Sequence, residues 1–167
     1  MDPIDSLSLC ESDQLLSLAG REDCSRVIHA MSQQAALSLL IFDDNLEPGL
    51  YDHPAFIDAV RRIATGDANA SIRILFYSPE KLLHRCHHLP ELIRRLSSRV
   101  EIRQLSRAYH HAFFVADGCG VVDRRVASRF EGIANFNDPA RAAELNAFFN
   151  TTWEMSSRNI ELQALQI

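Results

Sequence analysis

The feature that most constrains this chain is a set of short apolar or alternating runs, separated by longer segments in which apolar residues recur every three or four positions. The short runs span 36–42, 71–77 and 98–105, and the segments with helical spacing span 22–35, 52–65 and 78–96. Runs of the first kind are typical of strands, and strands that alternate with helices are typical of βαβ units. The pattern therefore predicts an α/β protein.

The rest of the chain adds a hairpin and a long helix. Two apolar runs, 112–117 and 120–124, adjoin Asp117-Gly118, a dipeptide that favours a tight hairpin turn. Asp138-Pro139 then begins a helix in which Trp153 belongs to the apolar face. We expect a mixed β-sheet flanked by helices, in the order helix, strand, helix, strand, helix, three strands and helix.

Individual residues predict two helix starts and one boundary. Asp52 is expected to cap the helix at 52–65, and Ser78-Pro79 is expected to begin the helix at 78–96. Residues 1–20 are polar and rich in small side chains, so we expect a loosely ordered segment with a short helical turn at 13–18. The folded domain is expected to span 21–167.

The composition is that of one acidic, globular domain. A chain of 167 residues suits a single core, and its net charge of −5 does not favour nucleic acid as a partner. No apolar run approaches the roughly 20 residues that span a bilayer, and the first residues do not resemble a signal peptide. We therefore expect no transmembrane segment and a cytoplasmic location. The four cysteines lie far apart and are expected to be free thiols.

The segment His110-His-Ala-Phe-Phe-Val-Ala-Asp117 is the most informative about function. Its histidine and aspartate have the spacing of an HxKxxxxD motif, and Gly132-Ile-Ala-Asn-Phe136 is similar to a GSxNF segment. In this order the two segments resemble the phospholipase D superfamily, and most closely a bacterial family of single-motif domains with a degenerate HxKxxxxD motif. The resemblance extends from about residue 22 and implies one phospholipase D-like half.

The resemblance also implies a phosphodiester chemistry. A histidine attacks phosphorus, a lysine neutralises the phosphoryl oxygens, and a second histidine protonates the leaving group. In this chain the lysine position is Ala112 and the serine position is Ile133. Losing a preorganised charge of this kind costs on the order of 3 kcal/mol of transition-state stabilisation. Because the chain carries one copy of a motif that acts in pairs, a composite site needs a homodimer.

Five residues are the site candidates. His110 and Asp117 are the surviving motif residues, and Asn135, Arg103 and Arg124 are candidate ligand-binding residues. The leading hypothesis is a non-catalytic, homodimeric domain that binds an unknown protein or a phosphate-containing ligand. Two alternatives remain open: a residual phosphodiesterase or nuclease with His110 as the nucleophile of a dimeric composite site, and a module that binds a membrane surface or lipid headgroup. No cofactor is expected.

Two further clusters have simpler interpretations. His84 and His88 are four residues apart and would share one face of the helix at 78–96, as two metal ligands can. No third ligand follows at a characteristic spacing, so we expect no metal and interpret them as histidines near a helix end. Asp43-Asp44 follows the first strand, where paired carboxylates can bind a cation, but a solvated loop with a cap is the commoner arrangement.

Overall fold

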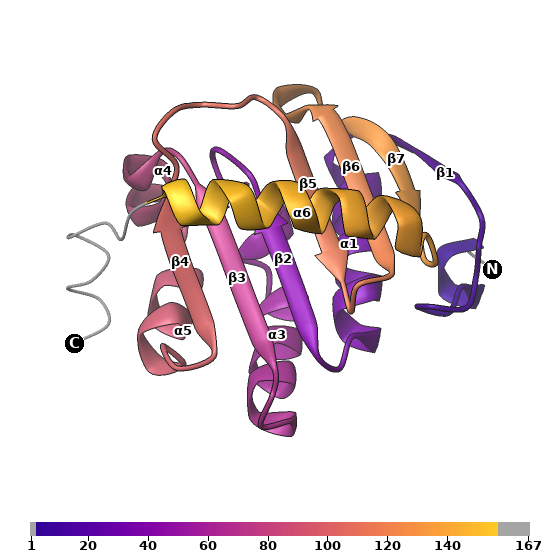
Figure 1. Cartoon of the computed structure of the whole chain (residues 1–167), viewed down its shortest axis with the longest axis horizontal. Coiled ribbons are helices and arrows are strands. Elements are labelled where there is room, and N and C mark those ends of the chain that lie inside the picture. The colour runs from indigo at the N-terminus through magenta and orange to yellow at the C-terminus, as the bar shows by residue number, and fades with distance from the viewer. Residues whose placement is uncertain (1–2, 157–167) are drawn as a thin grey trace.

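The protein forms a mixed β-sheet with helices against both faces, as seen in a computed structural model that describes residues 3–156 (Figure 1). The strands are β1 (Leu16–Ala19), β2 (Ser38–Phe42), β3 (Ser71–Phe76), β4 (Val100–Gln104), β5 (Ala112–Ala116), β6 (Gly120–Val126) and β7 (Glu131–Asn135). The helices are α1 (Arg21–Gln34), α2 (Pro48–Tyr51), α3 (Pro54–Gly66), α4 (Pro79–Arg85), α5 (Leu89–Arg95) and α6 (Pro139–Met155), with 3-10 turns η1 (Pro3–Ser6) and η2 (Ala127–Arg129). The predicted α/β class with a mixed, helix-flanked sheet is confirmed.

The strand order within the described residues is β1-β7-β6-β5-β2-β3-β4. β2, β3 and β4 are parallel, whereas β5, β6, β7 and β1 follow in antiparallel pairs. β2 pairs antiparallel with β5, with Phe42 beside Phe113, and joins the two halves. As a result, the carboxyl end of β2, the start of β5, the end of β6 and the start of β7 share one end of the sheet. We call this the motif end of the sheet.

Two apolar layers hold the sheet. α1 and α3 cover one face, where Val27 and Ile63 are buried against the strands, and α6 crosses the other face (Figure 1). α6 buries Phe149 beside Phe113 of β5, and Trp153 beside Arg73 of β3 and Arg103 of β4. The prediction of Trp153 as a core residue is confirmed. Each such side chain contributes roughly 1.5–3 kcal/mol by leaving water. Among residues 3–156, no helix combines the length and apolar character needed to cross a bilayer.

The sequence did not reveal strands β1 and β7. β1 pairs antiparallel with β7, with Leu16 beside Ala134, so the helical turn predicted at 13–18 is wrong. β1 lies at the edge of the sheet and is only four residues long, Leu-Ser-Leu-Ala, which is too short for its alternation to distinguish a strand from a helical turn. β7 contains Gly132, where a Cβ would collide with the carbonyl oxygen of Asp123. The boundary near residue 20 stays a prediction, and the limit at 167 lies outside the described residues.

Asp52 does not cap α3, contrary to the prediction. The N-cap is His53, whose Nδ1 accepts a hydrogen bond from the N–H of Ala55 at 3.1 Å. The Asp52 carboxylate instead accepts from the N–H groups of residues 87–89 at 3.0, 2.8 and 2.6 Å, where α5 begins. Local sequence favoured the nearer helix, because the partners of Asp52 lie more than 30 residues away.

Cys10 and Cys119 form a disulfide, so the prediction of four free thiols is wrong for this pair. Their Cα atoms are 5.3 Å apart across 109 residues of sequence, and a hydrogen bond of 2.8 Å from the N–H of Cys10 to the carbonyl of Phe136 helps to hold the first segment there. Cys24 and Cys86 are free and buried. Burial raises the pKa of both thiols, that of Cys86 to about 12, so neither is an activated nucleophile at neutral pH.

Candidate functional site

The candidate site lies at the motif end of the sheet, and three consecutive residues of β6 organise it. Neighbouring side chains of a strand point to opposite faces, so these residues alternate between the two layers. Asp123 points toward α6 and contacts Arg141, whereas Arg124 points toward the α1 layer and contacts Asp43. Arg125 lines the same cavity as Asp123.

Arg124 lies in a buried ion pair. Its side chain is 2% exposed, and its Nη2 donates to Oδ2 of Asp43 at 2.6 Å while Nη1 donates to the carbonyl of Ala127 at 2.7 Å. The Phe130 ring lies 4.8 Å from the guanidinium carbon. Burial raises the pKa of Asp43, and the nearby charge of Arg124 opposes this shift. Burial is the largest single influence on Arg124 and acts to lower its pKa, but the charges of Asp43, Tyr51 and Cys24 and the hydrogen bond to Asp43 together outweigh burial, so the pKa of Arg124 is raised. We call Arg124, Asp43, Ala127 and Phe130 the Arg124 cluster.

Ala112, at the lysine position of the motif, is the direct cross-strand neighbour of Arg124. Residues opposed in this way share a face of the sheet, so a lysine at 112 would lie beside the Arg124 guanidinium. Ala112 is fully buried, and a second cation there would be left without a counter-charge, which is strongly unfavourable. This face therefore carries its cation on β6 rather than β5, and Asp43 holds it.

A small cavity of about 150 Å³ opens beside the Arg124 cluster. Glu47 lines it and is approached by Nε of Arg21 at 3.9 Å and by Nη2 of Arg85 at 3.6 Å. Each arginine that lines this cavity therefore has a carboxylate partner. The space is small and its charges are already paired, so it offers little to a ligand.

On the opposite face, Asp123 joins His111 to Arg141. Nε2 of His111 lies 2.6 Å from Oδ1 of Asp123, and Arg141 donates to Oδ2 from Nε at 3.1 Å and from Nη2 at 2.6 Å. Burial acts to raise the pKa of Asp123, but the hydrogen bonds and charges of His111 and Arg141 outweigh burial and the pKa is lowered. Asp123 is thus an ionised group at neutral pH that fixes a histidine and an arginine in place.

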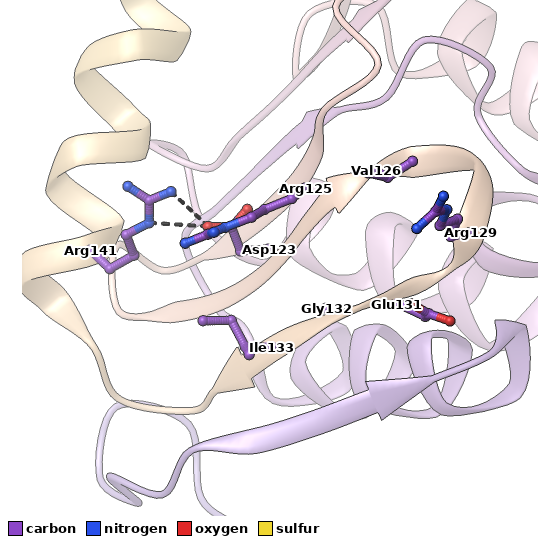
Figure 2. Close-up of a pocket in the computed structure, with 8 residues that line it drawn as sticks. All are labelled: Asp123, Arg125, Val126, Arg129, Glu131, Gly132, Ile133 and Arg141. Carbon is purple, nitrogen blue, oxygen red and sulfur yellow. Dashed lines mark hydrogen bonds and ion pairs between the residues drawn. The ribbon is translucent and has the colours of Figure 1, made fainter.

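A cavity of about 420 Å³ opens beside Asp123, between β6, η2, β7 and the start of α6 (Figure 2). It is lined by Asp123, Arg125, Val126, Arg129, Glu131, Gly132, Ile133 and Arg141. Ile133, at the serine position of the motif, is 44% exposed, and Val126 is 42% exposed. The lining thus combines cationic, anionic and apolar groups. We call this space the Asp123 cavity.

His110 is held by its backbone. Its N–H donates to Oδ2 of Asp44 at 3.0 Å, and its carbonyl accepts from the N–H of Ala127 at 2.8 Å. Its φ of 62° lies in the left-handed region, and its side chain is exposed. Within residues 3–156 no hydrogen bond engages the imidazole. A histidine nucleophile needs a group that orients it, and the described part of this chain supplies none to His110.

Asp43 and Asp44 are not a solvated loop. They are 3% and 5% exposed, and Asp44 accepts from the N–H groups of Tyr109 and His110, whereas Asp43 pairs with Arg124. Long-range partners account for the difference, because each carboxylate is bound by groups more than 60 residues later in the chain. The pair fixes the start of β5 against the end of β2.

Asp117 lies at the opposite end of β5 from His110. Its carboxylate accepts from the N–H groups of Ala36, Leu37 and Ser38 at 2.8, 2.8 and 2.9 Å. It therefore ties the turn between β5 and β6 to the start of β2. These bonds give the motif aspartate a role in the fold that requires no ligand.

Arg103 and Asn135 lie apart from His110. Arg103 on β4 donates from Nη1 to the carbonyl of Trp153 at 3.0 Å and lies over the indole ring. β4 is four strands from β6, or roughly 19 Å at the usual strand spacing. Asn135 is 8% exposed, and its Oδ1 accepts from the N–H of Gln14. The five predicted site residues therefore do not converge, and their roles toward a ligand stay predictions.

His84 and His88 do not share a helix face. α4 ends at Arg85, and His88 is the N-cap of α5, so the helix predicted over 78–96 is two helices. In the part of the chain that the structure describes, no group of three or more His, Cys, Asp or Glu side chains is arranged to hold a metal ion.

Sequence reasoning missed His111, Asp123 and Arg141. The available signal was a carboxylate inside an apolar strand, because buried aspartates are rare unless they are paired. Asp123 interrupts β6 in this way, and its partners lie 12 residues before it and 18 residues after it. The motif spacing favours His110, whereas the histidine that a carboxylate holds is its neighbour His111.

Comparison with solved structures identifies the fold. TrmBL2, described as an archaeal chromatin protein with a novel mode of DNA binding, is similar with a TM-score of 0.66 and 19% identity over 89% of this chain, which spans 55% of that chain. Nuc from Salmonella typhimurium, a phospholipase D family member, has a TM-score of 0.60 and 11% identity over 87% of this chain and 99% of its own. NucT from Helicobacter pylori has a TM-score of 0.59 and 13% identity over 88% of this chain and 98% of its own. The fold is phospholipase D-like, as the motif resemblance implied.

Comparison of the sequence with protein families gives a match over residues 20–165. A search of the curated proteins found no match. The matched residues take in both layers of helices and the motif end of the sheet. The chain therefore belongs to the family described as domain of unknown function DUF7931.

Proposed function

We propose that this chain is a non-catalytic phospholipase D-like domain that binds a ligand. The observation that carries the proposal is the Arg124 cluster, in which the cation beside the lysine position is bound to Asp43. Phosphodiester hydrolysis needs a cation that is free to stabilise the transferred phosphoryl group and a histidine that is oriented to attack. Arg124 is neutralised, and the imidazole of His110 has no hydrogen-bond partner among residues 3–156.

A homodimer is part of this proposal. The support for it is that the chain carries one copy of a motif that acts in pairs in the phospholipase D superfamily, so a composite site needs two chains. Sedimentation velocity at micromolar concentration is expected to show a dimer. A monomer under these conditions would remove the dimer and leave the binding role to be tested separately.

A phosphodiesterase is the second candidate, and the pair formed by His111 and Asp123 favours it. The two side chains are 2.6 Å apart and lie beside a cavity with arginines in its wall. A carboxylate that fixes the tautomer and orientation of a histidine is a common arrangement at catalytic sites. In this version His111 rather than His110 is the reacting histidine.

A chromogenic phosphodiester, bis(4-nitrophenyl) phosphate, separates the two functions. We expect no hydrolysis above the buffer rate and equal rates for the wild type, His110→Ala and His111→Ala. His84→Ala, which removes an exposed histidine on α4, is the matched control. Hydrolysis by the wild type that falls at least tenfold in His110→Ala or His111→Ala, and not in His84→Ala, would overturn the non-catalytic proposal and name the histidine.

Nucleic acid and a membrane surface stand outside the proposal. DNA binding is described for TrmBL2, but the net charge of −5 weighs against a broad phosphate-neutralising surface on this chain. The same charge weighs against an anionic membrane surface. The prediction that nucleic acid is not favoured can be tested by gel shift at low salt, and the alternative of membrane-surface binding by liposome co-sedimentation at low salt.

A further inference from the structure

The Asp123 cavity has the dimensions of a small-ligand site. Its volume of about 420 Å³ falls within the usual range of roughly 300–1,000 Å³ for pockets that hold small organic molecules. The cavity is formed by segments around the end of β6 and by the first turn of α6 (Figure 2). Because regular elements and their direct connections form the wall, the space is largely preformed.

The charges in this wall are unequally paired. Asp123 is occupied by His111 and Arg141, and Arg141 donates further to Glu144 at 2.8 Å. Arg125 and Arg129 both line the cavity, and no hydrogen bond or ion pair to another residue of the segment 3–156 engages either guanidinium. Among residues 3–156, the wall thus holds two arginines and one carboxylate, that of Glu131, without a hydrogen-bond or ion-pair partner, in a chain whose overall charge is −5.

The same wall has an apolar part. Ile133 and Val126 are among the few large apolar side chains that remain substantially exposed, and both line the cavity. Ile133 is the direct cross-strand neighbour of Asp123, so an apolar group lies next to the ionised carboxylate. At Gly132 the wall of the cavity is backbone alone. A side chain is excluded at this position, because its Cβ would collide with the carbonyl oxygen of Asp123.

We propose that the Asp123 cavity binds a small organic anion with an apolar body. Arg125 and Arg129 supply the positive charge that attracts the phosphate or carboxylate group of the ligand, because guanidinium groups pair with both oxyanions. The apolar body lies against Val126 and Ile133. Asp123 and Arg141 keep β6 and α6 at a fixed separation, and the fixed negative charge of Asp123 rejects cationic ligands. This inference rests on the proposed function as a binding domain and names its ligand class.

Isothermal titration with phenylphosphonate and with hexanoate tests the inference. Phenylphosphonate is chosen because its P–C bond resists hydrolysis, so binding is measured whether or not the chain has phosphodiesterase activity. At physiological salt we expect one of these probes to bind with a Kd below about 1 mM, and inorganic phosphate to bind at least tenfold more weakly because it lacks an apolar body. The stronger probe distinguishes a phosphate-type from a carboxylate-type ligand.

Variants locate the bound probe. Arg125→Ala and Arg129→Ala are each expected to weaken binding of the stronger probe at least fivefold, and Ile133→Ser to weaken it while leaving inorganic phosphate unchanged. Arg94→Ala removes an exposed arginine of α5 and should leave affinity unchanged. The inference is overturned if neither probe binds at 10 mM, or if binding is the same in the Arg125→Ala/Arg129→Ala double variant. Hydrolysis of the phosphodiester with intact probe binding would overturn the proposed function alone.

Discussion

At the motif end of the sheet, the charged side chains on the two faces are paired in different ways. In the Arg124 cluster, one arginine and one carboxylate are almost completely buried and bind each other. In the Asp123 cavity, one buried carboxylate binds two partly exposed groups, and two more arginines face open space. Adjacent residues of one strand thus stabilise the interior on one side and line an accessible cavity on the other.

This difference indicates where a ligand can bind on a phospholipase D-like fold that has Ala112 and Ile133 at the lysine and serine positions of the motif. In a buried ion pair each charge is bound to the other and is not available to a ligand. Removing one partner leaves the other charge buried without water or a counter-charge. An exposed arginine keeps its charge available, at little cost to stability. The contrast predicts that substitutions at three consecutive positions of β6 have very different effects.

The largest effect is expected at Arg124. Arg124→Ala leaves Asp43 buried without its counter-charge and should lower the free energy of unfolding by about 3–5 kcal/mol. Urea denaturation followed by circular dichroism measures this value. Replacing both partners, as in Asp43→Leu/Arg124→Met, should cost less than Arg124→Ala alone. A loss below about 1 kcal/mol in Arg124→Ala would show that the pair is not closed to water.

An intermediate, pH-dependent effect is expected at Asp123. Asp123→Asn should lower stability at pH 7 by about 1–2 kcal/mol, because charged hydrogen bonds to His111 and Arg141 are lost. The pKa of Asp123 is lower in the folded chain than its ordinary value near 4, so its contribution is present above that value and is lost as pH falls through the folded pKa. The difference between wild type and variant should therefore shrink as pH falls below about 4. A difference that does not shrink below about pH 4 would contradict the assignment.

The smallest effect is expected at Arg125. Its side chain is exposed and has no ion-pair partner among the described residues, so Arg125→Ala should change the free energy of unfolding by less than about 0.5 kcal/mol. The same urea titration measures it beside Arg124→Ala. A loss comparable to that of Arg124→Ala would remove the contrast between the two sides of the sheet.

Most of the fold could be predicted because its strands carry strong local patterns. The central strands β2, β3 and β5 are apolar over nearly their whole length, and α3 and α6 begin with proline after a capping residue. Edge strand β1 is only four residues long, so its Leu-Ser-Leu-Ala run is too short to identify it as a strand. Local signals therefore predict the middle of the sheet better than its border.

The candidate site was harder to predict because its contacts join residues that are distant in sequence. The motif spacing directs attention to the motif end of the sheet through His110, but the bond partners of Asp43 and Asp123 depend on strand order. Arg124 was predicted as a ligand-binding residue because of its charge, and that charge alone does not reveal the carboxylate of Asp43 81 residues earlier. Site chemistry follows from tertiary pairing, whereas the fold class follows from local periodicity.

The disulfide between Cys10 and Cys119 shortens the loop that must close when β1 pairs with β7 during folding. Leu16 pairs with Ala134, 118 positions later, which makes this contact one of high sequence separation. With the disulfide formed, the path from Leu16 through the bridge to Ala134 is about 21 residues, six to Cys10 and fifteen from Cys119. Loop-closure entropy scales with the logarithm of loop length, so the shorter path lowers the entropic barrier to this pairing by about 1.5 kcal/mol. The oxidised chain should thus complete its sheet faster than the reduced one.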